Sequence, residues 1–369
     1  MTGFSSGIYI PSFDNSGEIN LILTGGVGRR VNDNVKINSK TMFDVASITK
    51  LFTLILAFKL DEEGIINLDD KIKEMNPDFE GLEDYTFNDL IRMHGDICTN
   101  GNVASAKDEE EAYNLLKTAY LKDNSRDRNK YTDFGAIIIG KTLEYILSKR
   151  EGRNVSLEEL MNKYIYRKAN LESTGYNPLS LNITGNGGYD YLVHDPKARI
   201  LGGMVGSAGI FTTSEDLNKL AKSLYSVNYV NKGLINKQHL DRIGEITFPN
   251  AVQSNKGNLG VYVKHPLGYA KTFTPSLFSN GSFSHQGWTG SVALFDPNNN
   301  IHHNFLTNAI YKSDDKDLVR NDKPVGFGSA WDVYEENIVN NIMLMMIAKK
   351  YFNIYKDKEV NIDKNIVIK

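Results

Sequence analysis

Segments typical of β-strands lie at both ends of this chain and enclose a long block of helical periodicity. Residues 4–10 and 18–28 flank a turn at Asn15–Gly17, a pattern that predicts an antiparallel hairpin. Strand signals return only after about residue 257 and follow one another with short connections, as in an antiparallel meander. We therefore expect the two ends of the chain to build one sheet, with helices between them.

The sequence predicts the fold class α/β (α+β), with an antiparallel sheet flanked by N- and C-terminal helices and an inserted all-helical lobe. Residues 1–62 and 257–369 are assigned to the sheet domain, residues 63–256 to the mainly helical lobe, and the active site to a cleft between them. The expected later strands are Leu259–Val263, Ser282–Trp288, Ser291–Phe295 and His302–Thr307. The expected helices are Thr86–Met93, Glu110–Leu121, Phe134–Lys149, Ser156–Tyr166, one beginning at Thr213, and Trp331–Phe352.

Composition and charge argue against several classes of function. At 369 residues, with 41% apolar and 24% charged residues, the chain is long enough for one large domain or two lobes. The net charge is −3, and the sequence has no stripe of lysine and arginine with aromatic residues between them. Both observations argue against a nucleic-acid partner. The single cysteine, Cys98, excludes a cysteine-based metal site, and the adjacent His302 and His303 point to opposite faces of a strand. We expect neither a metal nor a cofactor.

No run of apolar residues is long enough to predict a transmembrane segment, and residues 1–7 lack the basic and apolar regions of a signal peptide. The chain as written therefore predicts a cytoplasmic protein. An extracytoplasmic location stays open, because a chain whose leader has been removed would look the same.

The helix expected from residue 47 to residue 64 carries a serine and a lysine on its apolar side. Lys50 follows Ser47 by three residues, so the amine and the hydroxyl project from adjacent turns within reach of each other. Ser47 also begins an apolar stripe at helical spacing, formed by Leu51, Leu54, Ile55 and Phe58. A buried ammonium is costly unless it is used, and this spacing suits a serine nucleophile with lysine as base or electrostatic activator.

A helix cap followed by a snorkelling lysine is the simpler alternative for the same pattern. The spacing Ser-x-x-Lys recurs in the charged run Ser313–Lys316, where a solvated loop explains it. The motif alone is therefore weak evidence for catalysis.

Two further elements are expected to face Ser47. Tyr131 lies where a charged loop meets the next helix, and His285 lies on an expected strand of the sheet, followed by Gly287 and Trp288. Each has an ordinary structural explanation when it is taken alone: an interface tyrosine, a hydrogen-bonded strand histidine and a core tryptophan.

Taken together and in order, three segments resemble the signatures of the penicillin-recognising serine hydrolases. The segments are Ser47-x-x-Lys50, Tyr131-x-Asp133 and His285-x-Gly287. They are most similar to the group of class C β-lactamases, D,D-carboxypeptidases and β-lactamase-fold esterases. The flanking stretches that agree are Asp89–His94, Val193–Ala198, Leu201–Gly203 and Ala208–Phe211. The resemblance implies a β-lactamase/transpeptidase-like fold, with one related domain over about residues 4–352.

The resemblance also implies roles for the residues of these segments. Ser47 would form an acyl-enzyme, while Tyr131 as a phenolate, helped by Lys50, takes the proton and returns it to the leaving group. The backbone N–H groups of Ser47 and Trp288 are the expected oxyanion donors, and Gly287 lets the substrate carbonyl approach the strand. The expected partner is a small-molecule or peptide substrate: an ester, a D-amino-acid peptide or a β-lactam.

Two departures from the family pattern bear on the substrate. The third signature is usually Lys-Thr-Gly or Lys-Ser-Gly, whereas here His285, a predicted catalytic residue, and Gln286, a predicted substrate-binding residue, replace the cation and the hydroxyl. A histidine is mostly neutral at pH 7, so the clamp for a substrate carboxylate is weakened. Asp133 replaces the usual asparagine, and its charge would hold Lys50 protonated, which favours Tyr131 as the base.

The expected function is that of a serine hydrolase with D,D-peptidase- or esterase-like activity. A true class C-like β-lactamase is the alternative within the same class. A penicillin-binding sensor or scaffold without turnover is the alternative outside it. His94, His194 and Asp195 are expected to be structural.

Overall fold

The computed structural model describes most of the chain as far as residue 308. The described residues are 3–11, 18–30, 33–122, 129–176, 192–230, 232–247, 257–264, 278–308, 319–320 and 323–324. The expected turn Asn15–Gly17, the expected helix Trp331–Phe352 and the charged run Ser313–Lys316 lie outside these residues.

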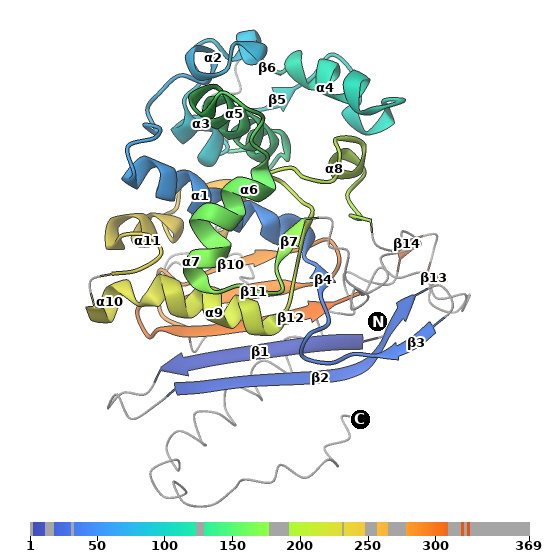
Figure 1. The fold of residues 1–369 in the computed structure, drawn as a ribbon, viewed down its shortest axis with the longest axis vertical. Coiled ribbons are helices and arrows are strands. Elements are labelled where there is room, and N and C mark those ends of the chain that lie inside the picture. The colour runs from blue at the N-terminus through green and yellow to red at the C-terminus, as the bar shows by residue number, and fades with distance from the viewer. Residues whose placement is uncertain are drawn as a thin grey trace, which may run out of the picture.

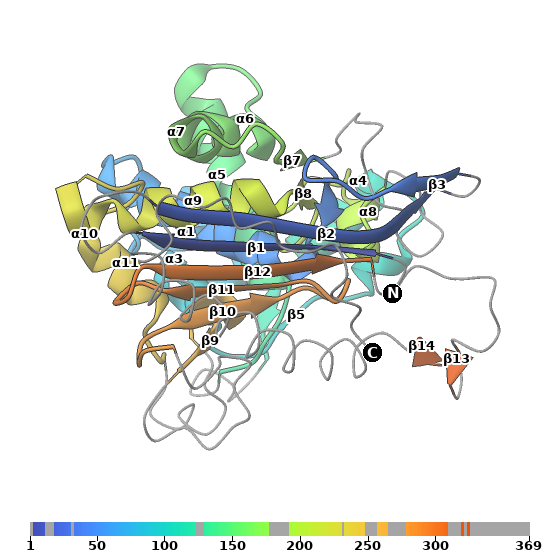
Figure 2. The same ribbon diagram turned by 90° about the horizontal axis from the view of Figure 1, so that it is seen from below.

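A seven-stranded antiparallel sheet combines strands from residues 3–36 with strands from residues 262–307 (Figure 1 and Figure 2), in the strand order β3-β2-β1-β12-β11-β10-β9. Its strands are β1 (Gly3–Pro11), β2 (Glu18–Arg30), β3 (Asp33–Lys36), β9 (Tyr262–Val263), β10 (Phe283–Gln286), β11 (Val292–Asp296) and β12 (Ile301–Thr307). β1 pairs with β12 in a register that sets Phe4 opposite Thr307 and Tyr9 opposite His302. The predicted hairpin and meander are therefore confirmed, and they share one sheet. A separate ladder pairs β13 (Val319–Arg320) with β14 (Lys323–Pro324).

The predicted helices of the described region are present, with ends shifted by a few residues. The α-helices are α1 (Thr49–Glu62), α2 (Ile72–Met75), α3 (Phe87–Ile91), α4 (Glu109–Lys117), α5 (Phe134–Glu151), α6 (Leu157–Met161), α7 (Arg167–Ala169), α8 (Pro196–Ile200), α9 (Ser214–Tyr225), α10 (Val227–Val230) and α11 (Lys237–Ile243). The short helical turns are η1 (Ala46–Ile48), η2 (Pro77–Leu82), η3 (Val103–Ser105), η4 (Asn162–Tyr166) and η6 (Asn258–Gly260). Capping boxes begin two of the helices, with Thr86 and Asp89 at α3 and Ser156 and Glu159 at α6.

α1 is the central helix of the molecule. The residues of its predicted apolar stripe are fully buried, and so are Phe52 and Leu56 on its other sides. A helix that is apolar all round belongs in a core, and α1 packs against α5 and η4. α9 lies against β1 and β12 (Figure 2) although it belongs to the predicted helical lobe, and the division into two domains stays a prediction.

The sequence predicted an all-helical block between the sheet segments. The structure shows that this block also contains short strands. β8 (Ile210–Thr212) pairs with both β4 (Phe43–Asp44) and β7 (Gly175–Tyr176). β5 (Ile97–Cys98) pairs with β6 (Tyr120–Leu121), so the helix expected to reach Leu121 ends earlier. Strands of two or three residues are too short to show an alternating pattern, and they form because a partner strand lies beside them.

The expected strand Leu259–Val263 is mostly absent. Only β9 remains, because η6 precedes it with Leu259 at φ +46° and Gly260 at φ +79°. Residues in the left-handed region turn the chain and cannot continue a pleated strand.

The adjacent histidines of β12 lie in the core. The ring of His302 lies 4.3 Å from that of Phe295 between centroids, and His303 Nε2 lies 3.2 Å from Ser6 Oγ. Among the residues that the structure describes, no group of three His, Cys, Asp or Glu side chains could hold a metal ion. Within the same ranges, no helix has the length and apolar character to cross a membrane.

Candidate active site

Ser47 lies in η1, a single turn between β4 and α1. Just before it the chain bends, and Ala46 takes a φ of +46°, which is uncommon for a residue with a side chain. Asp44 holds this bend, because its Oδ1 accepts a hydrogen bond from Ala46 N–H at 2.8 Å and its Oδ2 accepts one from His194 N–H at 2.8 Å. The bend places Ser47 at the N-terminal end of α1, where helices leave backbone N–H groups without helical acceptors.

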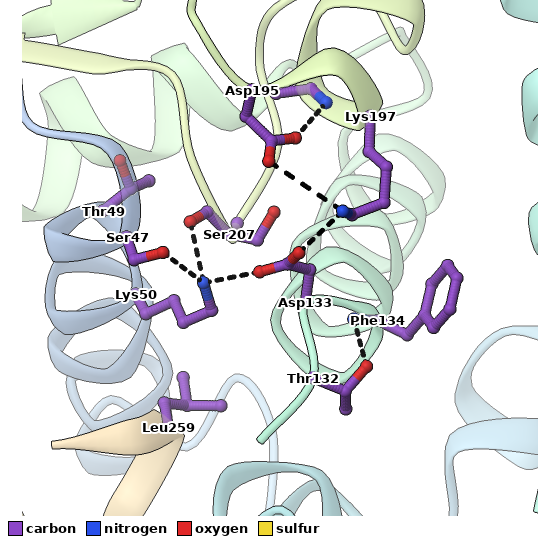
Figure 3. Close-up of polar contacts among 12 residues, drawn as sticks. Ser47, Thr49, Lys50, Thr132, Asp133, Phe134, Asp195, Lys197, Ser207 and Leu259 are labelled. Atoms are coloured by element: carbon purple, nitrogen blue, oxygen red, sulfur yellow. Dashed lines mark hydrogen bonds and ion pairs between the residues drawn. The ribbon is translucent and has the colours of Figure 1, made fainter. Parts of the chain in front are cut away.

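The side chain of Lys50 is fully buried, and oxygen atoms of three residues surround its ammonium (Figure 3). Lys50 Nζ lies 3.0 Å from Ser47 Oγ, 2.8 Å from Asp133 Oδ1 and 3.1 Å from the carbonyl oxygen of Ser207. Burial by itself lowers the pKa of this lysine, but the Asp133 carboxylate and then the Tyr131 phenol outweigh it and raise the pKa above 10.5. Lys50 is therefore an ammonium at neutral pH that donates a hydrogen bond to the Ser47 hydroxyl.

Asp133 also binds a second lysine. Lys197 Nζ lies 2.8 Å from Asp133 Oδ2 and 3.9 Å from Asp195 Oδ2 (Figure 3). Burial raises the pKa of Asp133, but Lys50 and then Lys197 outweigh burial and bring the pKa well below its usual range. Asp133 is thus a carboxylate shared by two ammonium groups.

Tyr131 lies in the loop before α5, as predicted, and is 38% exposed. Lys50 Nζ lies 5.0 Å from the centroid of its ring, within the range of a cation–π contact. Gly260 also lies against the ring, because an added Cβ there would lie 2.2 Å from Tyr131 Cε2. The loop before α5, the helix α1 and the turn η6 therefore meet at this ring.

His285 lies on β10 and is only 2% exposed. Its Nε2 lies 3.1 Å from the carbonyl oxygen of Leu259, and its Nδ1 lies 3.0 Å from the carbonyl oxygen of Gln286. Burial and, to a smaller extent, the Lys50 ammonium lower the pKa of His285 to about 4. The imidazole is therefore neutral at pH 7 and lies beside η6, while its predicted catalytic role stays a prediction.

The turn after β10 lies against the nucleophile segment. A Cβ added to Gly287 would lie 2.4 Å from the carbonyl oxygen of Val45, so this approach requires glycine. Gly290 N–H donates a hydrogen bond to the Gly287 carbonyl and closes a turn. Because of this turn, the strand expected over Ser282–Trp288 ends at Gln286, whose side chain is buried. Trp288 is 58% exposed, so the alternative of a core tryptophan is wrong. The oxyanion and substrate-binding roles of this turn stay predictions.

The three residues that were expected to be structural all have structural partners. His94 Nδ1 lies 3.1 Å from Asp89 Oδ1. The backbone N–H of His194 donates to the carboxylate that holds the nucleophile bend. Asp195 caps the N-terminus of α8 through its carboxylate, which also faces Lys197 and so joins the network around Lys50.

Sequence reasoning assigned no role to several residues of this site. For Lys197 the pair Asp195-Pro196 signals a helix start, but not which distant residue the helix faces. For Asp44 the signal is an acidic residue between two apolar ones. Ser207 contributes a backbone carbonyl, which a side-chain motif cannot reveal, and the turn η6 has no pattern that separates it from a strand.

A serine and a buried lysine lie next to each other at the start of a central helix, beside an antiparallel sheet, which is the architecture predicted for a β-lactamase-like fold. The family model described as Beta-lactamase matches residues 15–325, which is most of the chain. The chain therefore belongs to the Beta-lactamase family, and the predicted family and fold class are confirmed.

Individual relatives agree with this assignment. A protein of Escherichia coli strain K12, provisionally named a D-alanyl-D-alanine carboxypeptidase, is 25% identical in an alignment 309 residues long, which covers 72% of this chain and 69% of the relative. The structure of EstCE1, a hydrolase with promiscuous acyltransferase activity, gives a TM-score of 0.66 at 17% identity over 84% of this chain and 89% of that one. The D-amino acid amidase of Ochrobactrum anthropi SV3 gives 0.65 at 14% identity over 94% of each chain. At these identities the two structures establish the fold alone.

Proposed function

We propose that this protein is a serine hydrolase that forms an acyl-enzyme on Ser47 and has a D,D-peptidase- or esterase-like activity. The observation that carries the proposal is the 3.0 Å contact between the ammonium of Lys50 and the hydroxyl of Ser47, made by a fully buried lysine. Burying a charge costs free energy even when the charge is paired, so a structural role alone is a poor explanation for it. Membership of the Beta-lactamase family supports the same chemistry.

In the proposed mechanism, Ser47 Oγ attacks the substrate carbonyl and its proton passes to the phenolate oxygen of Tyr131. Lys50 stays protonated, because Asp133 holds its charge, and it stabilises the negative charge on the phenol oxygen. Tyr131 then gives the proton to the leaving group, whose departure leaves an ester on Ser47. Water then attacks this ester and gives a proton to the Tyr131 phenolate. Tyr131 passes that proton to Ser47 Oγ as the acyl bond breaks, which releases the acid and restores the free serine and the phenolate.

The proposed oxyanion donors are the backbone N–H groups of Ser47 and Trp288. Their support is positional, since Ser47 lies in η1 just before α1 and Trp288 follows Gly287 in the turn that lies against the carbonyl of Val45. Two N–H groups aimed at one oxygen would stabilise the charge that develops when the carbonyl is attacked.

The proposed substrate is an ester or a peptide that contains a D-amino acid. The names of the Escherichia coli relative and of the amidase support a D-amino-acid compound, and the hydrolase EstCE1 supports an ester. His285 is buried and neutral at pH 7, so it is poorly suited to grip a carboxylate beside the scissile bond. This argues against efficient β-lactam turnover and favours an ester, or a peptide without a free carboxylate at that position.

Intact-protein mass spectrometry of wild type and Ser47→Ala tests the proposal. Both proteins are exposed to a penicillin and, separately, to a nitrophenyl ester, while turnover is followed in parallel. We expect ester turnover or a slowly released penicilloyl adduct in the wild type, and neither in Ser47→Ala. Rapid loss of the lactam would instead identify a β-lactamase. A stable adduct without turnover of any substrate would identify a sensor, and equal behaviour of the two proteins would refute the proposal.

A further inference from the structure

The turn η6 has an unusual backbone beside the site. Leu259 is fully buried with φ +46° and ψ 35°, and Gly260 follows it with φ +79°. The left-handed region is ordinary for glycine but unfavourable for leucine, and it persists only where the surroundings hold the chain. η6 packs against α1, the helix that carries Lys50. At its start, Asn258 Nδ2 donates to the carbonyl oxygen of Arg242 at 2.5 Å.

The ring of Tyr131 packs directly against the backbone of Gly260. A Cβ at Gly260 would lie 2.2 Å from Tyr131 Cε2 and 2.5 Å from Tyr131 Cδ2, far inside van der Waals contact. The ring edge therefore rests on the backbone of η6, while Lys50 Nζ lies 5.0 Å from the ring centroid. A displacement of η6 would change the distance between the phenol and the ammonium.

His285 holds η6 from the side of the sheet. Its Nε2 is 3.1 Å from the Leu259 carbonyl oxygen, and its Nδ1 is 3.0 Å from the Gln286 carbonyl oxygen. A neutral imidazole has one N–H, so it donates to one of these two carbonyls at a time. The form with the proton on Nε2 ties η6 to β10. The form with the proton on Nδ1 leaves η6 without this hydrogen bond.

We infer that His285 is a positioning residue for Tyr131: through the carbonyl of Leu259 it fixes η6, and η6 seats the phenol beside Lys50. His285 then affects proton transfer without touching the substrate. This inference rests on the proposed roles of Ser47 and Tyr131. It requires an N–H donor at the place of Nε2, and it requires neither an acid nor a base at position 285.

Two amide substitutions separate these possibilities. In His285→Gln the amide N–H takes the place of Nε2–H, whereas in His285→Asn it takes the place of Nδ1–H. We expect His285→Gln to turn over p-nitrophenyl acetate within about tenfold of wild type, and His285→Asn to lose about a hundredfold in kcat, as misplacement by about 1 Å does. If His285 instead transferred a proton or contacted the substrate, both variants would lose the same amount of kcat. Equal losses in kcat would therefore overturn the inference.

Gly260→Ala tests the second link in this chain of contacts. We expect a loss in kcat of about a hundredfold, because the new Cβ displaces the Tyr131 ring. Gly64→Ala is the matched control: Gly64 has φ +63° at the other end of α1, and a Cβ there would meet nothing within 4 Å. It introduces the same kind of backbone strain, so we expect a lower melting temperature with kcat retained.

The double variant His285→Asn/Gly260→Ala should lose at most about threefold beyond the worse single variant, because both changes act through one ring. Multiplying losses would overturn the inference. If circular dichroism shows that His285→Asn does not fold, the test rests on His285→Gln. Retained turnover in His285→Gln together with reduced turnover in Gly260→Ala supports the inference. A His285→Gln variant that folds but is inactive refutes it. Full activity of Ser47→Ala would refute the proposed function instead, so the two failures are distinguishable.

Discussion

Asp133 Oδ2 lies 2.8 Å from Lys197 Nζ, and the other oxygen of the same carboxylate lies 2.8 Å from Lys50 Nζ. One acid therefore balances two ammonium groups. Burial lowers the pKa of Lys197, and Lys50 lowers it further because like charges repel, but Asp133 outweighs both and raises this pKa above its ordinary value. Burial alone would lower the pKa of Lys50, and Asp133 makes the largest contribution to keeping this lysine charged beside Ser47.

Asp133→Asn should lower the pKa of Lys50, because the buried lysine loses the carboxylate that outweighs burial. The alkaline limb of the kcat/KM profile, expected above pH 10.5 in the wild type, should move to lower pH by at least about one unit. The profile is measured with a nitrophenyl ester and corrected for spontaneous hydrolysis. Lys197→Met is the matched control, because it keeps the carboxylate and should not move the limb to lower pH. An unmoved limb in Asp133→Asn would assign it to another group.

Tyr131→Phe should abolish most turnover and leave the fold intact. A group that transfers the proton in the transition state contributes about 10²–10⁴-fold, whereas loss of a hydroxyl from a partly exposed ring should change stability by less than about 0.5 kcal/mol. Turnover and thermal melting are measured on the same preparations. Tyr262→Phe, on the neighbouring strand β9, is the control and should retain activity. Activity of Tyr131→Phe within tenfold of wild type would mean that Lys50 or another group handles the proton.

Asp44→Asn should weaken both the fold and the acylation of Ser47. The two carboxylate oxygens accept hydrogen bonds from Ala46 and His194, and an amide can accept only one of them. We expect a loss of about 2–3 kcal/mol in the free energy of unfolding and a fall of about 10–100-fold in kcat with little change in KM.

Urea unfolding and burst kinetics measure these effects of Asp44→Asn. Thr289→Val serves as a comparison, because the Thr289 hydroxyl donates to the backbone carbonyl of Asp44 at 2.8 Å and should be worth only about 1 kcal/mol. If Asp44→Asn is no worse than Thr289→Val, the carboxylate does not hold the nucleophile bend.

Acid should destabilise the fold through its buried histidines. Burial lowers the pKa of His302 and of His303 to about 3, while an unfolded histidine titrates near 6.5. Below pH 6.5 the unfolded chain therefore binds protons that the folded chain excludes, and stability that is complete above pH 6.5 is lost as the pH falls. Each histidine contributes a slope of about 1.4 kcal/mol per pH unit. Glu158, whose pKa burial raises, works in the opposite direction.

Urea unfolding at pH 7, 6 and 5 measures this slope. Carboxylates with lowered pKa, such as Glu62, contribute only below their unfolded value of 4.5, so histidines dominate this range. His303→Asn should reduce the slope by about one proton whatever its effect on absolute stability. Equal free energies of unfolding at pH 7 and pH 5 would contradict the prediction.

The elements that local pattern specifies could be predicted from the sequence. The strands at the two chain ends follow from alternation and turn residues, and the helix starts at Thr86 and Ser156 follow from capping residues three positions apart. The proximity of Ser47 and Lys50 follows from a separation of about one helical turn. η6 was missed because Leu259 adopts a left-handed conformation that only its surroundings enforce.

The sequence by itself determined the longer strands and helices, the family signatures and the neighbouring pair Ser47 and Lys50, because each depends on residues close together in the chain. Only the tertiary structure decided that Asp133 is shared with Lys197, and that His285 contacts the carbonyl of Leu259. Ion pairs between distant segments depend on how helices pack. Bonds to backbone carbonyls leave no trace in side-chain identity, because every residue carries the same acceptor.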